Sequence, residues 1–190
     1  QMVAVTVKAG SKAEMALPDG TFVHLNAATN LEYDVNNSKQ RLVKLSGEAF
    51  FDVAKNPDCP FKVIINDLQI EVVGTSFNVK TYKKDIVETS LLSGRIRISG
   101  GSLPHEYTLS PGQKATYSAM DRTLRISKAD AHVEAGWRDN YLIFESTPLI
   151  DVIAQIERWY GVEIRLHHKQ IAQDLLSGSF RNESIQNVIR

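Results

Sequence analysis

Apolar residues occupy every second position along much of the chain, and this alternation restricts the fold more than any other feature. It runs from Val3 to about Lys128, with a clear example at Phe61, Val63 and Ile65. A period of two places successive side chains on opposite faces of a strand, so that one face is buried. We therefore predict about a dozen short strands, as found in a sandwich, a barrel or a solenoid.

Turn residues separate the alternating runs. Asn, Asp, Gly and Pro favour turns because they tolerate or preset backbone angles that a strand cannot adopt. The predicted turns are Pro18-Asp19-Gly20, Asn36-Asn37-Ser38, Asn56-Pro57-Asp58, Gly100-Gly101, Pro111-Gly112 and Asp121-Arg122.

Three segments share a leucine and one or two small residues before a glycine. Stacked coils produce such a pattern, because each coil turns a corner where glycine fits most easily. The spacing of the segments is irregular, which leaves a twisted sandwich and a solenoid-like fold both open. The segments are Leu45-Ser46-Gly47, Leu92-Ser93-Gly94 and Leu109-Ser110-Pro111-Gly112.

After roughly Ala129 the apolar residues follow a helical spacing instead. Residues 148–160 place large apolar side chains on one face and polar ones on the other. Thr147 is the predicted N-cap, Pro148 suits the first helical position, and Gly161 suits a left-handed C-terminal cap.

Strands and a second helix are predicted around this helix, in the order β-α-β-β-α. They are Tyr141 to Phe144, Val162 to Leu166, Leu176 to Phe180, and a helix that starts at Ser184. The predicted fold class is therefore mainly β, with an all-β domain at 1–133 and a small α+β module at 137–190. The sequence stops at Arg190, which we expect to lie inside the second helix, with a closing strand missing.

Charge and composition exclude some classes of protein. Twenty-two basic and 22 acidic residues cancel, without a run of Lys or Arg, so we expect no nucleic-acid partner. Apolar runs such as Phe61 to Ile65 are far shorter than the roughly 20 residues that cross a bilayer, and no signal segment opens the chain. We therefore expect a soluble fragment. The single Cys59 has no second thiol with which to form a disulfide.

The candidate catalytic residues do not form a known constellation. Glu48 and Asp52 lie four residues apart on one predicted strand, about 13 Å, whereas glycosidase carboxylates lie within about 5 to 10 Å. We interpret Glu48 as a solvated or turn-stabilising residue. Ser76 lacks the second glycine of a nucleophile elbow. Gly100-Gly101 reads as a hairpin turn, and Cys59 as a buried or inert thiol.

The five histidines show no spacing typical of metal ligands. Neighbouring residues on a strand point to opposite faces, so the adjacent pair cannot readily bind one metal ion. We therefore predict no metal, no cofactor and no enzymatic activity. The histidines are His24, His105, His132, His167 and His168.

Five motifs follow one another along the alternating region. They are Leu17-Pro18-Asp19-Gly20-Thr21 with Leu25-Asn26-Ala27, Gly47-Glu48-Ala49-Phe50-Phe51-Asp52-Val53-Ala54 with Pro60-Phe61-Lys62-Val63, Val73-Gly74-Thr75-Ser76-Phe77-Asn78-Val79, Leu92-Ser93-Gly94, and Leu109-Ser110-Pro111-Gly112. In content and order these motifs resemble those of the FecR family of anti-sigma and sigma-regulator proteins.

The region from Trp137 onward resembles the C-terminal domain of Bacteroidetes-type FecR proteins. That domain is similar to the STN modules of secretins and TonB-dependent receptors, in agreement with the predicted β-α-β-β-α order. Together the two resemblances cover nearly the whole chain. The matching segments are Leu142-Ile143-Phe144, Thr147-Pro148-Leu149 and Glu157-Arg158-Trp159-Tyr160-Gly161-Val162.

The resemblance implies a single-pass inner-membrane protein whose cytoplasmic segment controls an extracytoplasmic-function (ECF) sigma factor. Its periplasmic part receives a signal from the N-terminal signalling domain of an outer-membrane TonB-dependent transducer. This sequence lacks the cytoplasmic segment and the membrane helix of that pattern. We therefore expect it to be the periplasmic sensor, which acts by binding other proteins.

We expect the transducer's signalling domain to dock on the C-terminal module and on nearby strand edges. An exposed strand edge can accept a strand from another chain through main-chain hydrogen bonds. The predicted partner-binding residues are Tyr141, Ile143, Glu157, Arg158, Glu163 and Arg165.

Aromatic residues leave a second function open, that of a carbohydrate- or small-ligand-binding β-domain. Such a domain would gather Tyr33, Tyr82 or Tyr107 on one concave face. Trp137, Trp159 and Tyr160 could likewise form a binding platform, although helical spacing favours a core position for the last two. An enzyme of the cupin or glycosidase type would need clustered His or carboxylate ligands, for which the sequence offers no pattern.

Overall fold

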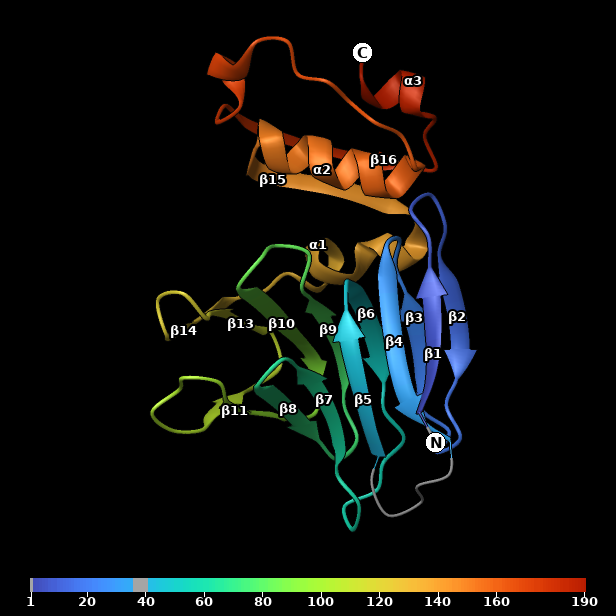
Figure 1. Cartoon of the computed structure of the whole chain (residues 1–190), viewed down its shortest axis with the longest axis vertical. Coiled ribbons are helices and arrows are strands. Elements are labelled where there is room, and N and C mark those ends of the chain that lie inside the picture. The colour runs from blue at the N-terminus through green and yellow to red at the C-terminus, as the bar shows by residue number, and fades with distance from the viewer. Residues whose placement is uncertain (1, 36–40) are drawn as a thin grey trace.

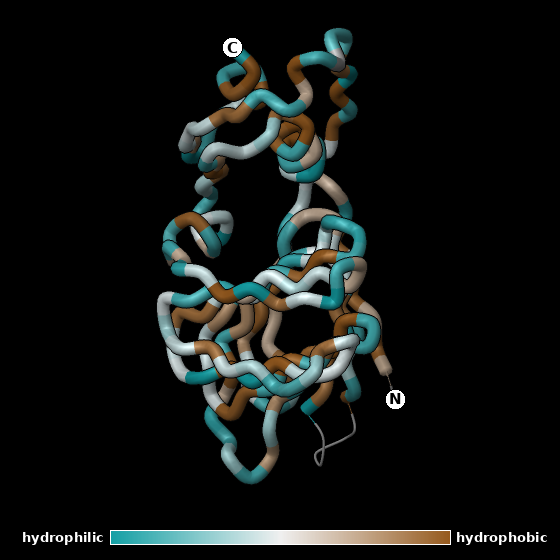
Figure 2. The backbone as a smooth tube through the Cα atoms, turned by 90° about the vertical axis from the view of Figure 1, so that its left-hand side faces the viewer, coloured by the Kyte–Doolittle hydropathy of each residue, from teal (hydrophilic) through white to brown (hydrophobic). Residues whose placement is uncertain are grey.

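The computed structural model describes residues 2–35 and 41–190 of the chain. The turn predicted at Asn36-Asn37-Ser38 lies outside these residues. The chain forms a large β part, to which we give the name β-sandwich, and a smaller C-terminal unit of residues 141–190 (Figure 1). A linker at 129–140 lies between the two parts in both views (Figures 1 and 2).

Fourteen strands form the β-sandwich. They are β1 (Met2–Val7), β2 (Ala13–Ala16), β3 (Phe22–Leu25), β4 (Thr29–Asp34), β5 (Arg41–Ser46), β6 (Glu48–Asp52), β7 (Phe61–Ile65), β8 (Leu68–Val72), β9 (Ser76–Lys80), β10 (Ile86–Ser93), β11 (Ile96–Gly100), β12 (Tyr107–Leu109), β13 (Gln113–Ser118) and β14 (Thr123–Lys128).

The strands build two seven-stranded sheets. One has the order β1-β4-β5-β7-β8-β11-β12 and the other β14-β13-β10-β9-β6-β3-β2. Neighbouring strands are antiparallel except β5 and β7, which are parallel. The chain crosses repeatedly from one sheet to the other, so the mainly β fold is confirmed. Of the two arrangements left open, the described residues form two seven-stranded sheets, and the glycines that suggested stacked coils, Gly47, Gly94 and Gly112, all have positive φ.

The predicted alternation places the apolar faces of both sheets in one core. Phe51, Phe61 and Phe77 are fully buried there, and the rings of Phe51 and Phe77 stack with their centroids 5.2 Å apart. Burial of a side chain of this size stabilises the fold by about 1.5 to 3 kcal/mol. The opposite faces of the strands carry polar residues, among them Glu48, Lys80 and Glu88 on one sheet.

The linker lies on the outer face of the sheet that contains β6 and β9. It comprises helix α1 (Ala131–Ala135) and the 3₁₀-helix η1 (Gly136–Asp139). The Asp130 carboxylate accepts a hydrogen bond from the amide of His132, 2.8 Å away, and so caps α1. Trp137 is buried against Phe50 on the sheet face.

The C-terminal unit packs one helix on a two-stranded sheet. Its apolar core joins Leu142 and Phe144 of the sheet to Val152 and Ile156 of the helix. The elements are β15 (Tyr141–Pro148), α2 (Leu149–Tyr160), the 3₁₀-helix η2 (Lys169–Ile171), β16 (Leu175–Arg181) and α3 (Ile185–Val188).

The caps of α2 are partly as predicted. Gly161 adopts the left-handed conformation with φ of 67°, as predicted. The N-cap prediction is wrong, because Pro148 takes that position without a side-chain hydrogen bond. Instead, the amides of Leu149 and Ile150 donate to the carbonyls of Asp174 and Ala172. A distant segment of backbone thus replaces the local cap that Thr147 was expected to supply.

The strand predicted at Val162 to Leu166 is also wrong. The segment has no ladder partner among the described residues, so the observed order of elements is β-α-β-α. The second helix begins after Ser184 as predicted. Its last residue is Val188, and the amide of Ile189 still donates to the carbonyl of Ile185.

Candidate functional site

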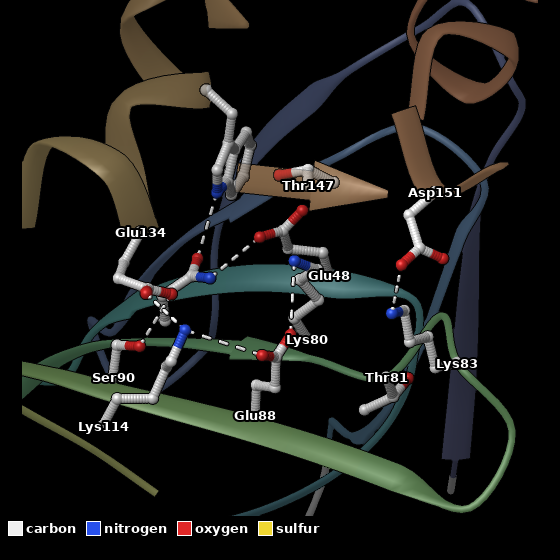
Figure 3. Close-up of polar contacts among 12 residues, drawn as sticks. Glu48, Lys80, Thr81, Lys83, Glu88, Ser90, Lys114, Glu134, Thr147 and Asp151 are labelled. Atoms are coloured by element: carbon white, nitrogen blue, oxygen red, sulfur yellow. Dashed lines mark hydrogen bonds and ion pairs between the residues drawn. The ribbon is translucent and has the colours of Figure 1, made fainter. Parts of the chain in front are cut away.

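A cleft of about 430 Å³ lies between the β-sandwich and the C-terminal unit. Its floor is the outer face of strands β6, β9, β10 and β13, and its other walls come from α1, β15 and α2. The lining is mostly polar, and charged side chains from several elements converge in it (Figure 3).

Strand register explains why charges meet on the floor. Glu48 of β6 lies opposite Lys80 of β9, and Lys80 lies opposite Glu88 of β10. Opposite charges on facing positions of neighbouring strands attract one another. The ammonium of Lys80 is 3.2 Å from the Glu88 carboxylate. Lys114 of β13 extends the row, with its ammonium 3.6 Å from Glu88 and 2.7 Å from Glu134 of α1.

Glu48 is buried at one end of this row. Its two carboxylate oxygens accept hydrogen bonds from the side-chain amides of Asn26 and Asn78, at 2.8 and 2.9 Å. The expected solvated position for Glu48 is therefore wrong. Asp52, four residues along β6, is exposed and accepts a hydrogen bond from the Ser76 hydroxyl at 2.7 Å.

Burial and neighbouring charges shift the pKa values of these groups in opposite directions. Burial raises the pKa of Glu48, although Lys80 and the two amides act against that shift. Burial alone would lower the pKa of Lys80, but the carboxylates of Glu48 and Glu88 outweigh it and the pKa is raised. Burial alone would raise the pKa of Glu88, but Lys80 and Lys114 outweigh it and the pKa is lowered.

The linker is bound to the floor through polar contacts as well as apolar ones. The indole nitrogen of Trp137 donates to the side-chain oxygen of Asn78 at 3.1 Å. The hydroxyl of Ser90 donates to Glu134 at 3.0 Å. Asn78 thus connects the linker to Glu48, and the position of the linker depends on the charged row.

The C-terminal unit contacts the β-sandwich through the loop between β1 and β2. The amide of Gly10 donates to the carbonyl of Arg158 at 2.8 Å. A Cβ atom on Gly10 would lie 3.3 Å from the backbone of Gly161, so the two segments approach closely. The Lys12 ammonium lies 3.6 Å from the centre of the Trp159 ring and donates to the carbonyl of Trp137 at 2.7 Å. Burial lowers the pKa of Lys12 to about 8.

Two further contacts cross the cleft. The guanidinium of Arg158 lies 4.0 Å from the centre of the Tyr82 ring. At the other end, the Lys83 ammonium is 2.6 Å from the Asp151 carboxylate. These side chains hold the two parts together by polar and aromatic contacts. Such contacts separate at a lower free-energy cost than an apolar core of the same size.

The six predicted partner-binding residues form three pairs with different surroundings. Arg158 faces Tyr82 across the cleft between the β-sandwich and the C-terminal unit. The carboxylate of Glu157 accepts a hydrogen bond from the amide of Ile164 at 2.7 Å. Tyr141 and Ile143 are half-buried and line the cleft. Glu163 and Arg165 are exposed and form an ion pair with each other, at 3.0 Å. Contact of these six residues with a partner stays a prediction.

The tyrosines named for ligand binding do not share one face. Tyr82 lines the cleft, whereas Tyr33 and Tyr107 pack against the core of the β-sandwich from different strands. Trp159 is half-buried and packs against two separate apolar clusters, one in the C-terminal unit and one at the linker. Tyr160 also packs on the core of the C-terminal unit. Both side chains are thus partly buried against a core, and Trp159 also lines the cleft.

The remaining candidates lie apart from one another. His24 lies between the rings of Phe22 and Phe50, 3.1 Å from Glu14. His105 stacks on Tyr107, and His132 packs edge-on against Tyr141. Within residues 2–35 and 41–190 no group of three His, Cys, Asp or Glu side chains is placed to hold a metal ion. Cys59 is a free, half-buried thiol.

Local sequence patterns could not identify the row of charged residues on the cleft floor or the residues that connect the C-terminal unit to the β-sandwich. Lys12 and Lys80 lie in no motif, and Asn78 lies in a motif that assigned it no role; the roles of all three depend on which strands are neighbours. The register of β6, β9 and β10 would have aligned Glu48, Lys80 and Glu88 in advance. None of the helices that the structure describes combines the length and apolarity that a bilayer crossing requires.

Comparisons with known proteins agree with this architecture. Residues 3–97 match the model of the FecR protein family, and residues 141–190 match the model of the FecR C-terminal domain. No curated protein matches the chain.

Two crystal structures are similar over nearly the whole chain. Both are of a candidate anti-sigma factor from Parabacteroides distasonis. The first, at 2.50 Å resolution, has a TM-score of 0.90 and 31% sequence identity, and the match covers 99% of this chain and 88% of that chain. The second, at 1.65 Å, has a TM-score of 0.89 and 31% identity, with 98% and 88% covered. The chain therefore belongs to the FecR family of sigma-factor regulators.

Proposed function

We propose that this chain is the periplasmic sensor part of a FecR-type regulator. It relays a signal from the N-terminal signalling domain of an outer-membrane TonB-dependent transducer to an ECF sigma factor. The sigma factor is held by a cytoplasmic segment of an inner-membrane-anchored protein, outside these 190 residues. The chain acts by binding proteins, with no reaction of its own. This fits a cleft whose charged groups are already paired with one another.

One observation carries the docking part of the proposal, an exposed apolar patch on the C-terminal unit. Its four residues are 41 to 63% exposed. The segments that carry these residues are neighbours, because β15 pairs with β16 and because the carbonyls of Ala172 and Asp174, just after η2, accept hydrogen bonds from the first amides of α2. Leu175 and Leu176 are adjacent on β16 and point to opposite faces of that strand. We give the name docking patch to Ile150, Ile171, Leu175 and Leu176.

An apolar patch of this kind favours a protein partner. A soluble domain gains free energy when large exposed apolar side chains are covered, and such patches often mark interaction sites. The patch includes the first two residues of β16, which has β15 as its single strand neighbour within the described residues. A partner strand could therefore add main-chain hydrogen bonds at that edge while its side chains cover the patch.

Leu175→Asp is expected to weaken binding of the cognate signalling domain about tenfold or more, because a carboxylate would be desolvated in the interface. Leu175 is 63% exposed, so the fold is expected to survive the change. Isothermal titration calorimetry with the purified signalling domain measures the affinity.

Met120→Asp provides the matched control. Met120 is 79% exposed in the turn between β13 and β14, outside the C-terminal unit, and its variant is expected to bind normally. Equal affinity of the Leu175→Asp variant and the unchanged chain would rule out the docking patch. Charge reversal at Glu163 and Arg165 then tests whether the surface extends to those residues.

A further inference from the structure

The segment Val162–Leu166 has the sequence pattern of a strand but pairs with no other strand among the described residues. Val162, Ile164 and Leu166 alternate with Glu163 and Arg165, as in a half-buried strand. In the structure the segment carries no helix and follows α2 as a stretched trace, which starts where Gly161 meets the loop between β1 and β2 (Figure 1). We call it the open strand.

One side of the open strand is already bonded to α2. The amide of Val162 donates to the carbonyl of Glu157, and the amide of Ile164 donates to the Glu157 carboxylate. Backbone groups alternate in direction along an extended chain, so those of Glu163 and Arg165 point the other way. Within the described residues no main-chain hydrogen bond of these two residues is formed. They therefore form a free edge.

The open strand is complementary to itself. Antiparallel pairing about Ile164 sets Glu163 opposite Arg165 of a second copy, and Arg165 opposite Glu163 of that copy. Val162 then faces Leu166 across the same axis. Each facing Glu and Arg pair would exchange two main-chain hydrogen bonds, as a hydrogen-bonded antiparallel pair does. The two exposed charges, 73 and 81% accessible, would meet opposite charges.

We propose that the open strand pairs with the open strand of a second copy of this chain. The pairing is antiparallel, with a two-fold axis at Ile164, and it forms an isologous interface. The charge pattern favours a second copy over an unrelated strand. The two-fold axis places Glu163 of each copy opposite Arg165 of the other, so both facing pairs carry opposite charges. Five residues bury little surface, so the association is weak and depends on concentration.

The proposed self-association goes beyond the proposed function. It needs no transducer and no sigma factor, so its failure leaves the docking patch untouched. If a signalling domain also uses Glu163 and Arg165, the second copy and the signalling domain exclude each other. Self-association would then lower the concentration of chains free to bind.

Charge variants test the pairing on the chain alone. Glu163→Arg and Arg165→Glu each place like charges opposite one another in a pair of identical chains, which is destabilising. Sedimentation equilibrium is expected to show concentration-dependent dimers of the unchanged chain and at least a tenfold weaker association of each variant. Both residues are exposed, so circular dichroism is expected to show an unchanged fold.

Mixing the two single variants is the decisive step. One variant carries two basic residues on its open strand and the other two acidic ones, so a mixed pair is complementary at both positions. Equimolar mixing is expected to restore association to at least the level of the unchanged chain. The double variant Glu163→Arg with Arg165→Glu keeps one acid and one base and is expected to associate normally.

Hydrogen exchange locates the pairing in the chain. The amides of Glu163 and Arg165 are expected to exchange fast in dilute solution and to gain protection as the concentration rises. Three results would overturn the proposal: a monomer at every concentration, single variants that associate as the unchanged chain does, or no gain on mixing. Protection of these amides in the monomer would also overturn it, because the edge would then be paired within its own chain.

Discussion

Glu48→Ala is expected to reduce the free energy of unfolding by about 2 to 6 kcal/mol, since two buried amide donors would each lose an acceptor at about 1 to 3 kcal/mol. The donors belong to Asn26 and Asn78. Asn78 also accepts the hydrogen bond of Trp137, so the loss reaches the linker. Urea unfolding followed by tryptophan fluorescence measures the change.

Glu14→Ala is the matched control for this experiment. Glu14 lies on the same sheet, in β2, with a carboxylate side chain that is 62% exposed beside His24. Loss of an exposed side-chain contact of this kind costs up to about 1 kcal/mol. A similar destabilisation by both substitutions would contradict the role assigned to Glu48.

The Glu48→Gln variant adds a pH dependence of predictable sign. Because burial raises the pKa of Glu48 above 4.5, the folded chain holds this proton to higher pH than the unfolded chain does. Stability falls with pH where the folded state binds more protons. Relative to the Gln variant, the unchanged chain is therefore expected to lose stability as the pH rises above about 4.5. A difference that stays constant from about pH 4 to 8 would contradict the raised pKa.

Gly47→Ala is expected to cost about 2 to 6 kcal/mol, from backbone strain and overpacking together. Gly47 lies between β5 and β6 with φ of 112°, a conformation that alanine rarely adopts. A Cβ atom there would lie 2.7 Å from the Cα of Thr29, a backbone atom that cannot move aside cheaply. Thermal and urea unfolding measure the loss.

Gly112→Ala separates strain from crowding. Gly112 has φ of 80°, and an added Cβ would meet nothing within 4 Å. Its variant is therefore expected to lose only the backbone cost of about 1 to 2 kcal/mol. Equal losses at Gly47 and Gly112 would show that the contact with Thr29 carries no energy.

The strands of the β-sandwich could be predicted because their signal is local. Inward residues such as Phe61 and Ile70 are apolar, and this marks the buried face of their strand whichever strand lies beside it. The pairing of β5 with β7 in parallel could not be predicted, because β6 separates them in sequence and belongs to the other sheet. Periodicity states which face is buried and leaves open which strand is the neighbour.

The errors in the C-terminal unit have a common physical cause. Thr147 was a suitable cap by residue type, but the carbonyls of Ala172 and Asp174 reach the first amides of α2 instead. Arg158 lies on the polar face of the helix, yet it packs on Tyr82, 76 positions away in sequence. In each case a contact between distant segments replaced the local preference.

Glu48 shows the same limit at the candidate site. An acidic residue within an alternating strand is normally exposed. Its burial depends on the linker and the C-terminal unit, which lie over the outer face of the sheet. The cleft therefore exists only in the assembled chain, and no window of sequence contains it.

The loop between β1 and β2 has a mechanical consequence. It grips the end of α2 through Gly10 and Lys12, although these residues belong to the beginning of the chain. Tension on the C-terminal unit would therefore reach the outermost strand β14 through the linker, and β1 and β2 through this loop. Each of these two is an outermost strand with one neighbour, β4 or β3. Under mechanical load these outermost strands would detach from their sheets first, while the inner strands of the β-sandwich stayed folded.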